Sequence, residues 1–363
     1  MIHVVLPDDH NDHSDNDHGG LPAAGGRRLA FYLAMEEWIA RNLPPAEYFF
    51  TWVVAPSVIC GRNQDMEAEV NMPYCRSHGI SVYRRRSGGG CVYADLQNIM
   101  CSYITPATGV VTTFAGFTGR LAARLRRMGI DARATGRNDI TVDGRKISGN
   151  AFYHIPGRSI VHGTMLYATD ADNMLNAITP DRAKLLSKRV QSVQSRIVTA
   201  SQLLPDMTFE AFHAALLDGL CEERITLTAD QVRQIEVLEQ DYYRPEWLAG
   251  KSPRTKAGMR CGTAAERIEG CGGLRVTVVT DAAGVIDDIT VRGDFFTLAF
   301  DLDGALLDRL RGCRAQEADL SRALRAVDVA QVIPGLDNDT LVTLTVRAAA
   351  ATAAPAAANV EHS

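Results

Sequence analysis

The sequence RRRSGGG at residues 84–90 is the most informative stretch of this chain. It follows the alternating segment ISVY at residues 80–83, which predicts a short β-strand that ends in a loop. The glycines at 88, 89 and 90 carry no Cβ, so the loop can turn several backbone N–H groups toward one anion. The motif alone leaves two interpretations open, a phosphate site and a flexible turn.

The arginines beside the loop supply permanent positive charge. Because side chains alternate along a strand, we expect Arg84 and Arg86 on one face and Arg85 on the other. The forked guanidinium of arginine suits phosphate oxygens. The spacing differs from both GxxxxGK[ST] and GxGxxG, which excludes the P-loop and the Rossmann dinucleotide motif.

A second polar stretch surrounds a predicted hairpin. Asn138 and Asp139 stand just before a predicted strand, where such side chains either help to hold a metal or nucleotide or form an Asx turn. Lys146 follows the turn at Asp143 and Gly144, and its compact charge can contact a carboxylate and a phosphate together. A lysine exposed to solvent is the alternative reading of Lys146.

A third stretch, VHGTML at residues 161–166, combines a histidine with a glycine. His162 is a candidate base or hydrogen-bond partner, or else a buried structural histidine. Gly163 permits close approach of a ligand or of backbone. Val92, Met165 and Leu166 are candidates for lining an apolar slot, or are plain core residues.

The rest of the chain alternates helical and strand patterns. Between residues 132 and 169 the pattern is strand-like, and residues 264–279 and 285–291 predict a meander, whereas residues 339–346 fit either type. The helix at 112–128 is expected to be capped by Thr112 or Thr113. Helical patterns occupy residues 29–43, 112–128, 209–222, 229–243, 301–311 and 316–330.

Composition narrows the class of protein. A length of 363 residues suggests about two domains. A net charge of −5 argues against a nucleic-acid partner. No run approaches the ~20 apolar residues of a membrane helix, and the N-terminus lacks signal-peptide features, so we expect a cytoplasmic protein with no membrane partner. Eight cysteines without a CxxC pair predict reduced thiols rather than a zinc site.

Two segments stand apart from the predicted core. Residues 9–26 are rich in Asp, Asn, His and Gly and predict a flexible insertion, with His10, His13 and His18 as a metal-binding alternative. Residues 348–363, which are mostly alanine, predict a disordered tail.

The motifs occur in a fixed order, as RRRSGGGCVYADLQN (84–98), TGRNDITVDGRKISGNAF (135–152) and VHGTMLYATD (161–170). Together they resemble the lipoate–protein ligase A family of the biotin/lipoate ligase superfamily, in its long form with a C-terminal accessory domain. AMEEWIA (34–40) and QSVQSRIVTASQLLP (191–205) are similar to the same family.

The resemblance implies an α+β fold with a large mixed-sheet catalytic domain of the biotin/lipoate ligase type and a small α+β C-terminal domain. We expect the catalytic domain at residues 1–245 and the accessory domain at residues 246–347, because the pattern changes near Pro245.

The resemblance also implies roles for individual residues. Lys146 matches the catalytic lysine that contacts both the acyl carbonyl and the phosphate, and Asp139 matches a residue near Mg²⁺. The residues matching the ATP and adenylate site are Arg85, Ser87, Gly88, Gly89, Gly90, Val92, Tyr93, Asn138, Asp139 and Lys146. Those matching the lipoate site are Lys146, Ser148, Gly149, Ala151, His162, Gly163 and Thr164.

The implied activity is ATP-dependent. Lipoate or octanoate would be activated to an acyl-adenylate with ATP and Mg²⁺, without a tightly bound prosthetic group. The acyl group would then pass to a lysine of lipoyl domains in 2-oxoacid dehydrogenase complexes or of a glycine-cleavage H-type protein. The alternatives are an ATP-independent octanoyl or lipoyl transferase, a biotin ligase and a non-catalytic lipoyl-binding protein.

Overall fold

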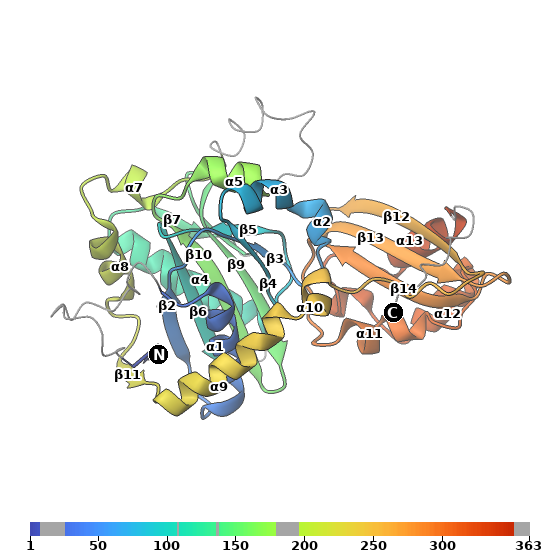
Figure 1. Cartoon of the computed structure of the whole chain (residues 1–363), viewed down its shortest axis with the longest axis horizontal. Helices are drawn as coiled ribbons and strands as arrows, with labels where there is room; N and C mark the ends of the chain where they lie inside the picture. Colours follow the sequence, from blue (N-terminus) through green and yellow to red (C-terminus); the bar gives the residue numbers. More distant parts are fainter. Residues whose placement is uncertain (8–25, 107–108, 136–137, 179–195, 352–363) are drawn as a thin grey trace. The chain divides into compact units, whose positions relative to one another are not determined.

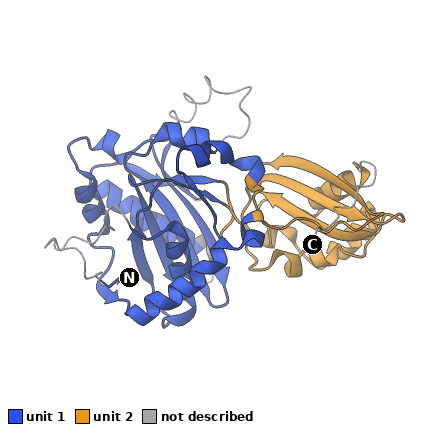
Figure 2. Cartoon of the chain, in the orientation of Figure 1, with its two compact units in different colours: residues 1–60, 67–85, 91–248 blue, residues 61–66, 86–90, 249–363 orange. Residues whose placement is uncertain are grey.

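The computed structural model describes residues 1–7, 26–106, 109–135, 138–178 and 196–351. The chain forms two compact units (Figure 2). The N-terminal unit comprises Met1–Cys60, Glu67–Arg85 and Cys91–Leu248. The C-terminal unit comprises Gly61–Met66, Arg86–Gly90 and Ala249–Ser363. Two short segments from early in the sequence, 61–66 and 86–90, therefore belong with the C-terminal unit.

The N-terminal unit is built on a mixed sheet of eight strands. Strand β1 pairs in parallel with both of its neighbours, β11 and β2. The other neighbouring strands of this sheet pair antiparallel, in the spatial order β2, β6, β10, β9, β8 and β7. In spatial order the strands are β11 (Glu223–Thr226), β1 (Ile2–Val5), β2 (Tyr48–Trp52), β6 (Asn98–Thr105), β10 (Arg158–Leu166), β9 (Arg145–Ile155), β8 (Asp139–Val142) and β7 (Ala132–Ala134).

A smaller sheet carries the arginine stretch. It has three strands in the order β4 (Ser81–Arg84), β3 (Ser57–Cys60) and β5 (Val92–Ala94). Strand β3 pairs in parallel with β4 and antiparallel with β5. Strands β2 and β3, which flank Pro56, thus lie in different sheets.

Helix α1 (Leu29–Asn42) covers one face of the large sheet and is buried along most of its length. It also packs against α9 (Ala229–Glu239), as Figure 1 shows. A helix covered on both sides needs apolar residues all round, which explains its continuous apolar sequence. Tyr153 and Ile155 of β9 join the α1 core, whereas Phe152 between them packs edge-on against Phe114 of α4 (Val110–Arg127). The two helices therefore cover opposite faces of the sheet.

Helix α4 differs from expectation at its start. The N-cap residue is Gly109, so the predicted caps at Thr112 and Thr113 are wrong. Thr112 lies in the first turn, and its hydroxyl donates to the Gly109 carbonyl oxygen at 3.0 Å. Gly129, with φ of +91°, follows the last turn. The remaining short helices of the N-terminal unit are α2 (Met66–Glu69), α3 (Met72–Ser77), α5 (Ala171–Ala177), α7 (Ala200–Leu203), α8 (Phe209–Leu217), η1 (Gln240–Tyr243) and α10 (Pro245–Ala249).

The C-terminal unit pairs an antiparallel sheet with helices. Its three strands are β12 (Arg260–Ile268), β13 (Gly272–Thr280) and β14 (Ile286–Gly293), so the strand pattern at 264–279 is two strands joined by a turn. Residues 339–346 lie in a helix, which extends to Ala350 and thus into the segment expected as a tail. The helices are α11 (Leu302–Ala305), η2 (Leu307–Arg309), α12 (Glu317–Leu324), η3 (Val329–Gln331) and α13 (Asn338–Ala350).

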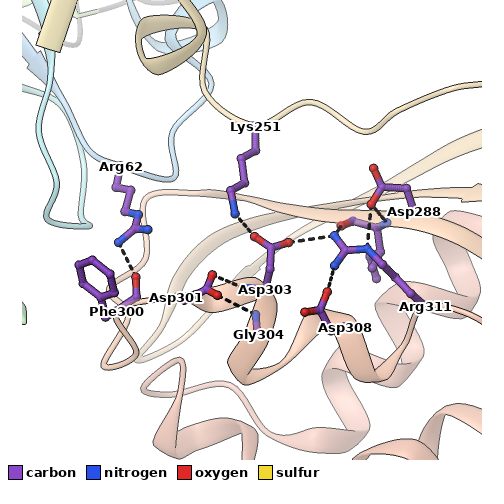
Figure 3. A network of polar contacts seen from close by, with 10 residues as sticks. Arg62, Lys251, Asp288, Phe300, Asp301, Asp303, Gly304, Asp308 and Arg311 are labelled. Carbon is purple, nitrogen blue, oxygen red and sulfur yellow. Dashed lines mark hydrogen bonds and ion pairs between the residues drawn. The ribbon is translucent and has the colours of Figure 1, made fainter. Parts of the chain in front are cut away.

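A polar network organises one part of the C-terminal unit (Figure 3). Arg311 contacts Asp288 at 3.0 Å and Asp303 at 2.9 Å, and it also pairs with Asp308. Lys251 pairs with Asp303 from the other side. The expected fold class, a large mixed sheet with helices plus a small α+β unit, is confirmed.

Two further expectations concerned membrane helices and the two segments outside the predicted core. Among the residues that the structure describes, no helix is both long and apolar enough to cross a bilayer. The predicted insertion at 9–26 and the last twelve residues of the predicted tail, 352–363, lie outside the described residues, apart from Gly26.

Candidate active site

The predicted lysine lies in the β8–β9 hairpin. Its Nζ is 2.8 Å from Oδ1 of Asp139, and both side chains are about one third exposed, at 37% and 31%. A Cβ built on Gly149 would lie 2.5 Å from the Lys146 Nζ, so the lysine side chain lies directly over Gly149. Only glycine leaves room for this arrangement. The structure therefore brings Lys146, Asp139 and Gly149 into one cluster.

A bulge in the hairpin sets the direction of Lys146. Asp139 pairs with Gly149, but beyond Ile140 the register shifts and Lys146 pairs with Thr141. The shift leaves Ile147 as the extra residue of the bulge. Without the bulge, strict alternation would place Lys146 and Gly149 on opposite faces of the sheet. The bulge thus turns the lysine onto the face that Gly149 shares.

The backbone of Lys146 is fixed by a neighbouring segment. Its N–H donates to the Arg196 carbonyl oxygen at 2.7 Å, and its carbonyl accepts from the N–H of Val198 at 2.9 Å. Arg196 and Val198 belong to the segment 191–205 that resembles the family, of which residues 191–195 lie outside the described part. Both polar backbone groups of Lys146 are thereby paired, which holds its position in the sheet.

The face that carries Lys146 and Asp139 continues across the sheet. Successive register partners are Asp139 of β8, Gly149 of β9, Thr164 of β10, Met100 of β6 and Trp52 of β2. Since adjacent strands lie about 4.8 Å apart, this row spans roughly 19 Å. We call these five residues the cross-strand row. Trp52 at its far end stacks on Tyr32 of α1, with ring centroids 5.0 Å apart.

A buried polar cluster lies beside the far end of the row. Glu36 of α1 accepts from the Ser102 hydroxyl at 2.6 Å and contacts Nδ1 of His162 at 2.8 Å. Trp52 Nε1 donates to the Ser102 oxygen at 2.8 Å. These four side chains are all buried. A carboxylate with no exposure needs such partners, because an unpaired buried charge is strongly unfavourable.

Glu36, Ser102 and Trp52 were missed as site candidates from the sequence, although the signal was present. Glu36 stands in the middle of a helix whose neighbours are almost all apolar. Charged residues are rarely fully buried without a partner. A glutamate at the core-facing position of such a helix therefore indicates a specific polar contact.

Gly163 and Asn150 meet on the opposite face of the same strands. A Cβ on Gly163 would lie 2.0 Å from Oδ1 of Asn150, so glycine is required there for packing. Asn150 donates through Nδ2 to the Asn138 carbonyl oxygen and to Ser148 Oγ, at 3.1 Å each. Asn138 thus contributes its backbone carbonyl to this contact. Ser148 and Gly163 face away from Lys146, whereas Ala151, His162 and Thr164 share its face.

Two arginines of this stretch, Arg84 and Arg85, are buried in the N-terminal unit, whereas Arg86 is half-buried and belongs to the C-terminal unit. Arg84 donates to the Leu248 carbonyl oxygen at 2.8 Å, and Arg85 Nη1 donates to the Ile59 carbonyl oxygen at 2.9 Å. Burial lowers the pKa of Arg85 to about 10, which still leaves it cationic at neutral pH. The Arg85 guanidinium therefore stays positively charged inside the N-terminal unit.

The glycine loop itself belongs to the C-terminal unit. The Gly89 N–H donates to the Phe295 carbonyl oxygen at 3.0 Å, and a Cβ on Gly88 would lie 2.4 Å from the same oxygen. Gly88 is therefore required for close backbone packing against Phe295. Ser87 accepts through its carbonyl from the Arg62 N–H at 2.8 Å. The Gly89 amide is bonded to the Phe295 carbonyl oxygen, so the anion cradle predicted from SGGG stays a prediction.

The remaining candidates lie in or near the core. Tyr93 of β5 is buried, and burial followed by the nearby Asp95 raises its pKa well above the usual range. Met165 and Leu166 are buried too, and Val92 is half-buried beside the α1 core. Among the described residues, no group of three or more His, Cys, Asp or Glu side chains could hold a metal, so Asp139 stands as a single candidate ligand.

Comparison with known proteins places the chain in a family. Residues 28–221 match the family described as lipoyl protein ligase A/B catalytic domain, and residues 263–344 match the bacterial lipoate protein ligase C-terminus. The chain belongs to the lipoyl protein ligase A/B family, which confirms the resemblance drawn from the motifs.

Curated relatives share most of their length with this chain. Lipoate–protein ligase 1 of Staphylococcus aureus is 35% identical over 323 residues, which cover 86% of this chain and 95% of that protein. Lipoate-protein ligase LplJ of Bacillus subtilis is 35% identical over 278 residues, which cover 73% and 81%.

Solved structures share the fold. The lipoate complex of LipL1 from P. falciparum has a TM-score of 0.67 at 20% identity and covers 89% of this chain and 96% of its own. Lipoate-protein ligase A bound with ATP has a TM-score of 0.56 at 23% identity and covers 69% and 98%.

Proposed function

We propose that this protein is an ATP-dependent lipoate–protein ligase. It activates lipoate or octanoate to the acyl-adenylate with release of pyrophosphate, and then transfers the acyl group to a lysine of a lipoyl carrier domain. The observation that carries the proposal is the position of Lys146, which a bulge directs over Gly149 at the polar end of the cross-strand row. Membership of the lipoyl protein ligase A/B family supports it.

The first half-reaction joins two anions. The carboxylate of the acyl substrate attacks the α-phosphorus of ATP, and pyrophosphate leaves. A fixed cation between the carboxylate and the phosphate lowers their repulsion, and its effect grows where water is excluded. In this proposal Lys146 supplies that charge and Asp139 orients its ammonium.

The acyl chain lies along the cross-strand row in this proposal. Gly149, over which the Lys146 side chain lies, and Ala151 are small residues on the α1 face of β9. From β9 to β6 the distance is about 10 Å, roughly the reach of an eight-carbon chain. The far end would then meet the cluster of Glu36, His162 and Ser102.

The nucleotide is proposed to bind Arg85, Val92, Tyr93, Asn138, Asp139 and the loop from Ser87 to Gly90. The loop amides serve the phosphates only when the Gly89 N–H exchanges its partner Phe295 for the nucleotide. Mg²⁺ would enter with ATP, since this ion typically takes one or two carboxylates plus substrate phosphates. Asp139 is the protein ligand that fits this pattern, and bound Mg²⁺ would neutralise phosphate charge.

The second half-reaction needs a protein partner. The ε-amine of the carrier lysine attacks the acyl carbonyl of the mixed anhydride, an amide forms and AMP leaves. We propose lipoyl domains of 2-oxoacid dehydrogenase complexes and an H-type protein of glycine cleavage as carriers, in the cytoplasm. A solved structure with a TM-score of 0.57 at 26% identity describes a bipartite ligase and its E2 lipoyl domain, which supports such a carrier. The proposed catalytic domain ends near residue 245.

One assay separates this function from its alternatives. Purified protein is incubated with Mg²⁺, lipoate and an apo lipoyl domain, with or without ATP, while pyrophosphate and the mass of the carrier are measured. A ligase releases pyrophosphate and adds the lipoyl mass only when ATP is present. Transfer without ATP from an octanoylated carrier would indicate a transferase, and lipoate binding without pyrophosphate would indicate a non-catalytic protein.

A further inference from the structure

Two cysteines face each other at the end of the small sheet. Cys60 ends β3, and β5 begins one residue after Cys91. Their Sγ atoms are 3.4 Å apart, as thiols in hydrogen-bond contact. The antiparallel register pairs Val58 with Tyr93 and Ile59 with Val92. The next step of this register places Cys60 directly opposite Cys91.

This placement suits a disulfide. Directly opposed residues of an antiparallel pair have Cα atoms about 4.5–5.5 Å apart, within the range of about 4.4–6.8 Å that disulfides span. The sulfurs would have to approach by about 1.4 Å to bond. Rotation about χ1 of the two cysteines supplies such a shift with little backbone movement.

The surroundings make the pair reactive. The hydrogen bond with Cys91 lowers the pKa of Cys60, and the positive charges of Arg84 and Arg85 act in the same direction, although burial opposes them. The same hydrogen bond, followed by burial, raises the pKa of Cys91 well above its usual range, so the proton of the pair stays on Cys91. The thiolate is the nucleophile in disulfide exchange. Cys60 is buried, whereas Cys91 is partly exposed and can meet a small oxidant. The pair therefore combines one accessible sulfur with one that resolves a mixed disulfide.

Each cysteine adjoins one of two segments whose backbones are in contact. Cys60 is followed by segment 61–66, and Cys91 is preceded by the glycine loop 86–90. The Arg62 N–H donates to the Ser87 carbonyl oxygen at 2.8 Å. A Cβ on Gly61 would lie 2.0 Å from the Gly89 carbonyl oxygen, so the two backbones are in close contact. A disulfide between the cysteines would covalently link segment 61–66 to the glycine loop at the ends that adjoin the cysteines.

We propose that Cys60 and Cys91 form a reversible disulfide that restrains the glycine loop and thereby slows adenylation. The effect on adenylation rests on the proposed function, whereas the disulfide does not. In the proposed function, the Gly89 N–H must leave the Phe295 carbonyl oxygen before it can bind a phosphate. A covalent tie at the base of the loop removes part of the freedom that this exchange requires.

The oxidant is a small disulfide such as oxidised glutathione. Cys91 Sγ attacks one glutathione sulfur while its proton passes to the Cys60 sulfur with which it is in hydrogen-bond contact, and the first glutathione leaves as a thiolate. Cys60 gives this proton to the released glutathione, and its thiolate then attacks Sγ of Cys91 and releases the second glutathione. The two cysteines lose two electrons and two protons, and the glutathione disulfide gains both. Excess reduced glutathione reverses the reaction.

The test compares reduced and oxidised full-length protein. Protein is equilibrated with oxidised glutathione and desalted, and the linked peptides are mapped by mass spectrometry. Adenylation is measured with octanoate, because lipoate itself carries a disulfide. We expect a crosslink between Cys60 and Cys91, a fall in the adenylation rate on the order of tenfold, and recovery after reduction. Amide hydrogen exchange of residues 86–90 should slow in the oxidised form.

Cysteine variants test whether the effect of oxidation depends on the pair of Cys60 and Cys91. In Cys60→Ser, and separately in Cys91→Ala, the ratio of oxidised to reduced rate should be near one, whatever the basal rate. Cys313→Ser leaves the pair intact and should respond like the wild type. Absence of the crosslink, or a crosslink that alters neither the rate nor hydrogen exchange, overturns the inference. If the reduced protein makes no adenylate, the proposed function fails, and the crosslink with its exchange pattern still decides the structural part.

Discussion

At the scale of single residues, the central feature is one lysine positioned by one glycine. Lys146 Nζ occupies the space where a side chain at residue 149 would begin, and Asp139 holds it from β8 at 2.8 Å. The contacting atoms belong to the flexible end of the lysine. A methyl group at residue 149 would therefore displace the ammonium while the backbone remains in place.

Gly149→Ala should reduce adenylation without unfolding the protein. Its Cβ would lie 2.4 Å from Cε of Lys146, so the ammonium must move. We expect kcat/KM for acyl-adenylate formation to fall on the order of a hundredfold, because shifts of about 1 Å can have this effect. Steady-state pyrophosphate release measures it.

Gly116→Ala is the matched control, because apart from its chain neighbours and the backbone of its own helix no atom lies within 4 Å of a Cβ at this position in α4. It should keep full activity and gain about 0.5–1 kcal/mol in stability. Equal activity of the two alanine variants would show that Gly149 does not position Lys146.

The sequence predicted this region through its residue types. A lysine beside a turn and glycines within strands mark places where chemistry or close approach occurs. The direction of Lys146 could not be predicted in this way, because alternation alone puts it on the face opposite to Gly149. The bulge at Ile147 turns Lys146 onto the face of Gly149, and no single residue type in the hairpin predicts this bulge.

At the scale of elements, strand register assembles the site. The cross-strand row joins residues from Trp52 to Asp139 that are far apart in the sequence. Strong apolar patterns predicted most strands, and α1 and α4 were expected near their observed positions. The order of strands and the contact of Glu36 with His162 depend on tertiary pairing, which local patterns do not contain.

Helix α8 supplies a pH-dependent contact with the large sheet. Nε2 of His213 lies 2.8 Å from Oγ1 of Thr51 in β2. Burial, with a smaller effect of His3, lowers the pKa of His213 to about 4. Because the unfolded chain binds a proton near pH 6.5 and the folded chain does not, stability falls as the pH drops from about 6.5 to about 4. Above pH 6.5 this histidine contributes no pH dependence.

His213→Gln should reduce this loss, since glutamine retains a hydrogen bond to Thr51 and does not titrate. Between pH 7 and pH 4 the wild type should lose up to about 3 kcal/mol more stability than the variant. Urea unfolding at several pH values measures the difference. Parallel stability profiles for the two proteins would show that His213 does not titrate differently on folding.

At the scale of the whole molecule, two units are interleaved in sequence. Segments 61–66 and 86–90 belong to the C-terminal unit although they precede most of the N-terminal unit. Local patterns predicted the SGGG loop but not its contact with Phe295, which is 206 positions from Gly89. Such contacts arise from tertiary folding alone, so the conformation of the loop could not be inferred from its composition.

Arg311→Met should destabilise the C-terminal unit. Arg311 contacts three carboxylates, of which Asp288 and Asp303 are largely buried at 14% and 18% exposure (Figure 3). Removal of the cation leaves these charges without this partner, at a cost of about 3 kcal/mol. Arg322→Met removes an exposed pair with Asp319 and should cost less than about 1 kcal/mol. Hydrogen exchange in β14 and η2 reports the effect, and equal effects of both variants would contradict it.

The most direct test is a single-turnover measurement of lipoyl-adenylate by mass spectrometry. It uses wild type, Lys146→Ala and the control Lys256→Ala, which removes an exposed lysine paired with Asp287 in the C-terminal unit. We predict that wild type and Lys256→Ala accumulate adenylate, whereas Lys146→Ala, with an unchanged circular dichroism spectrum, forms almost none. Near-normal adenylate from folded Lys146→Ala would show that the lysine does not carry the reaction.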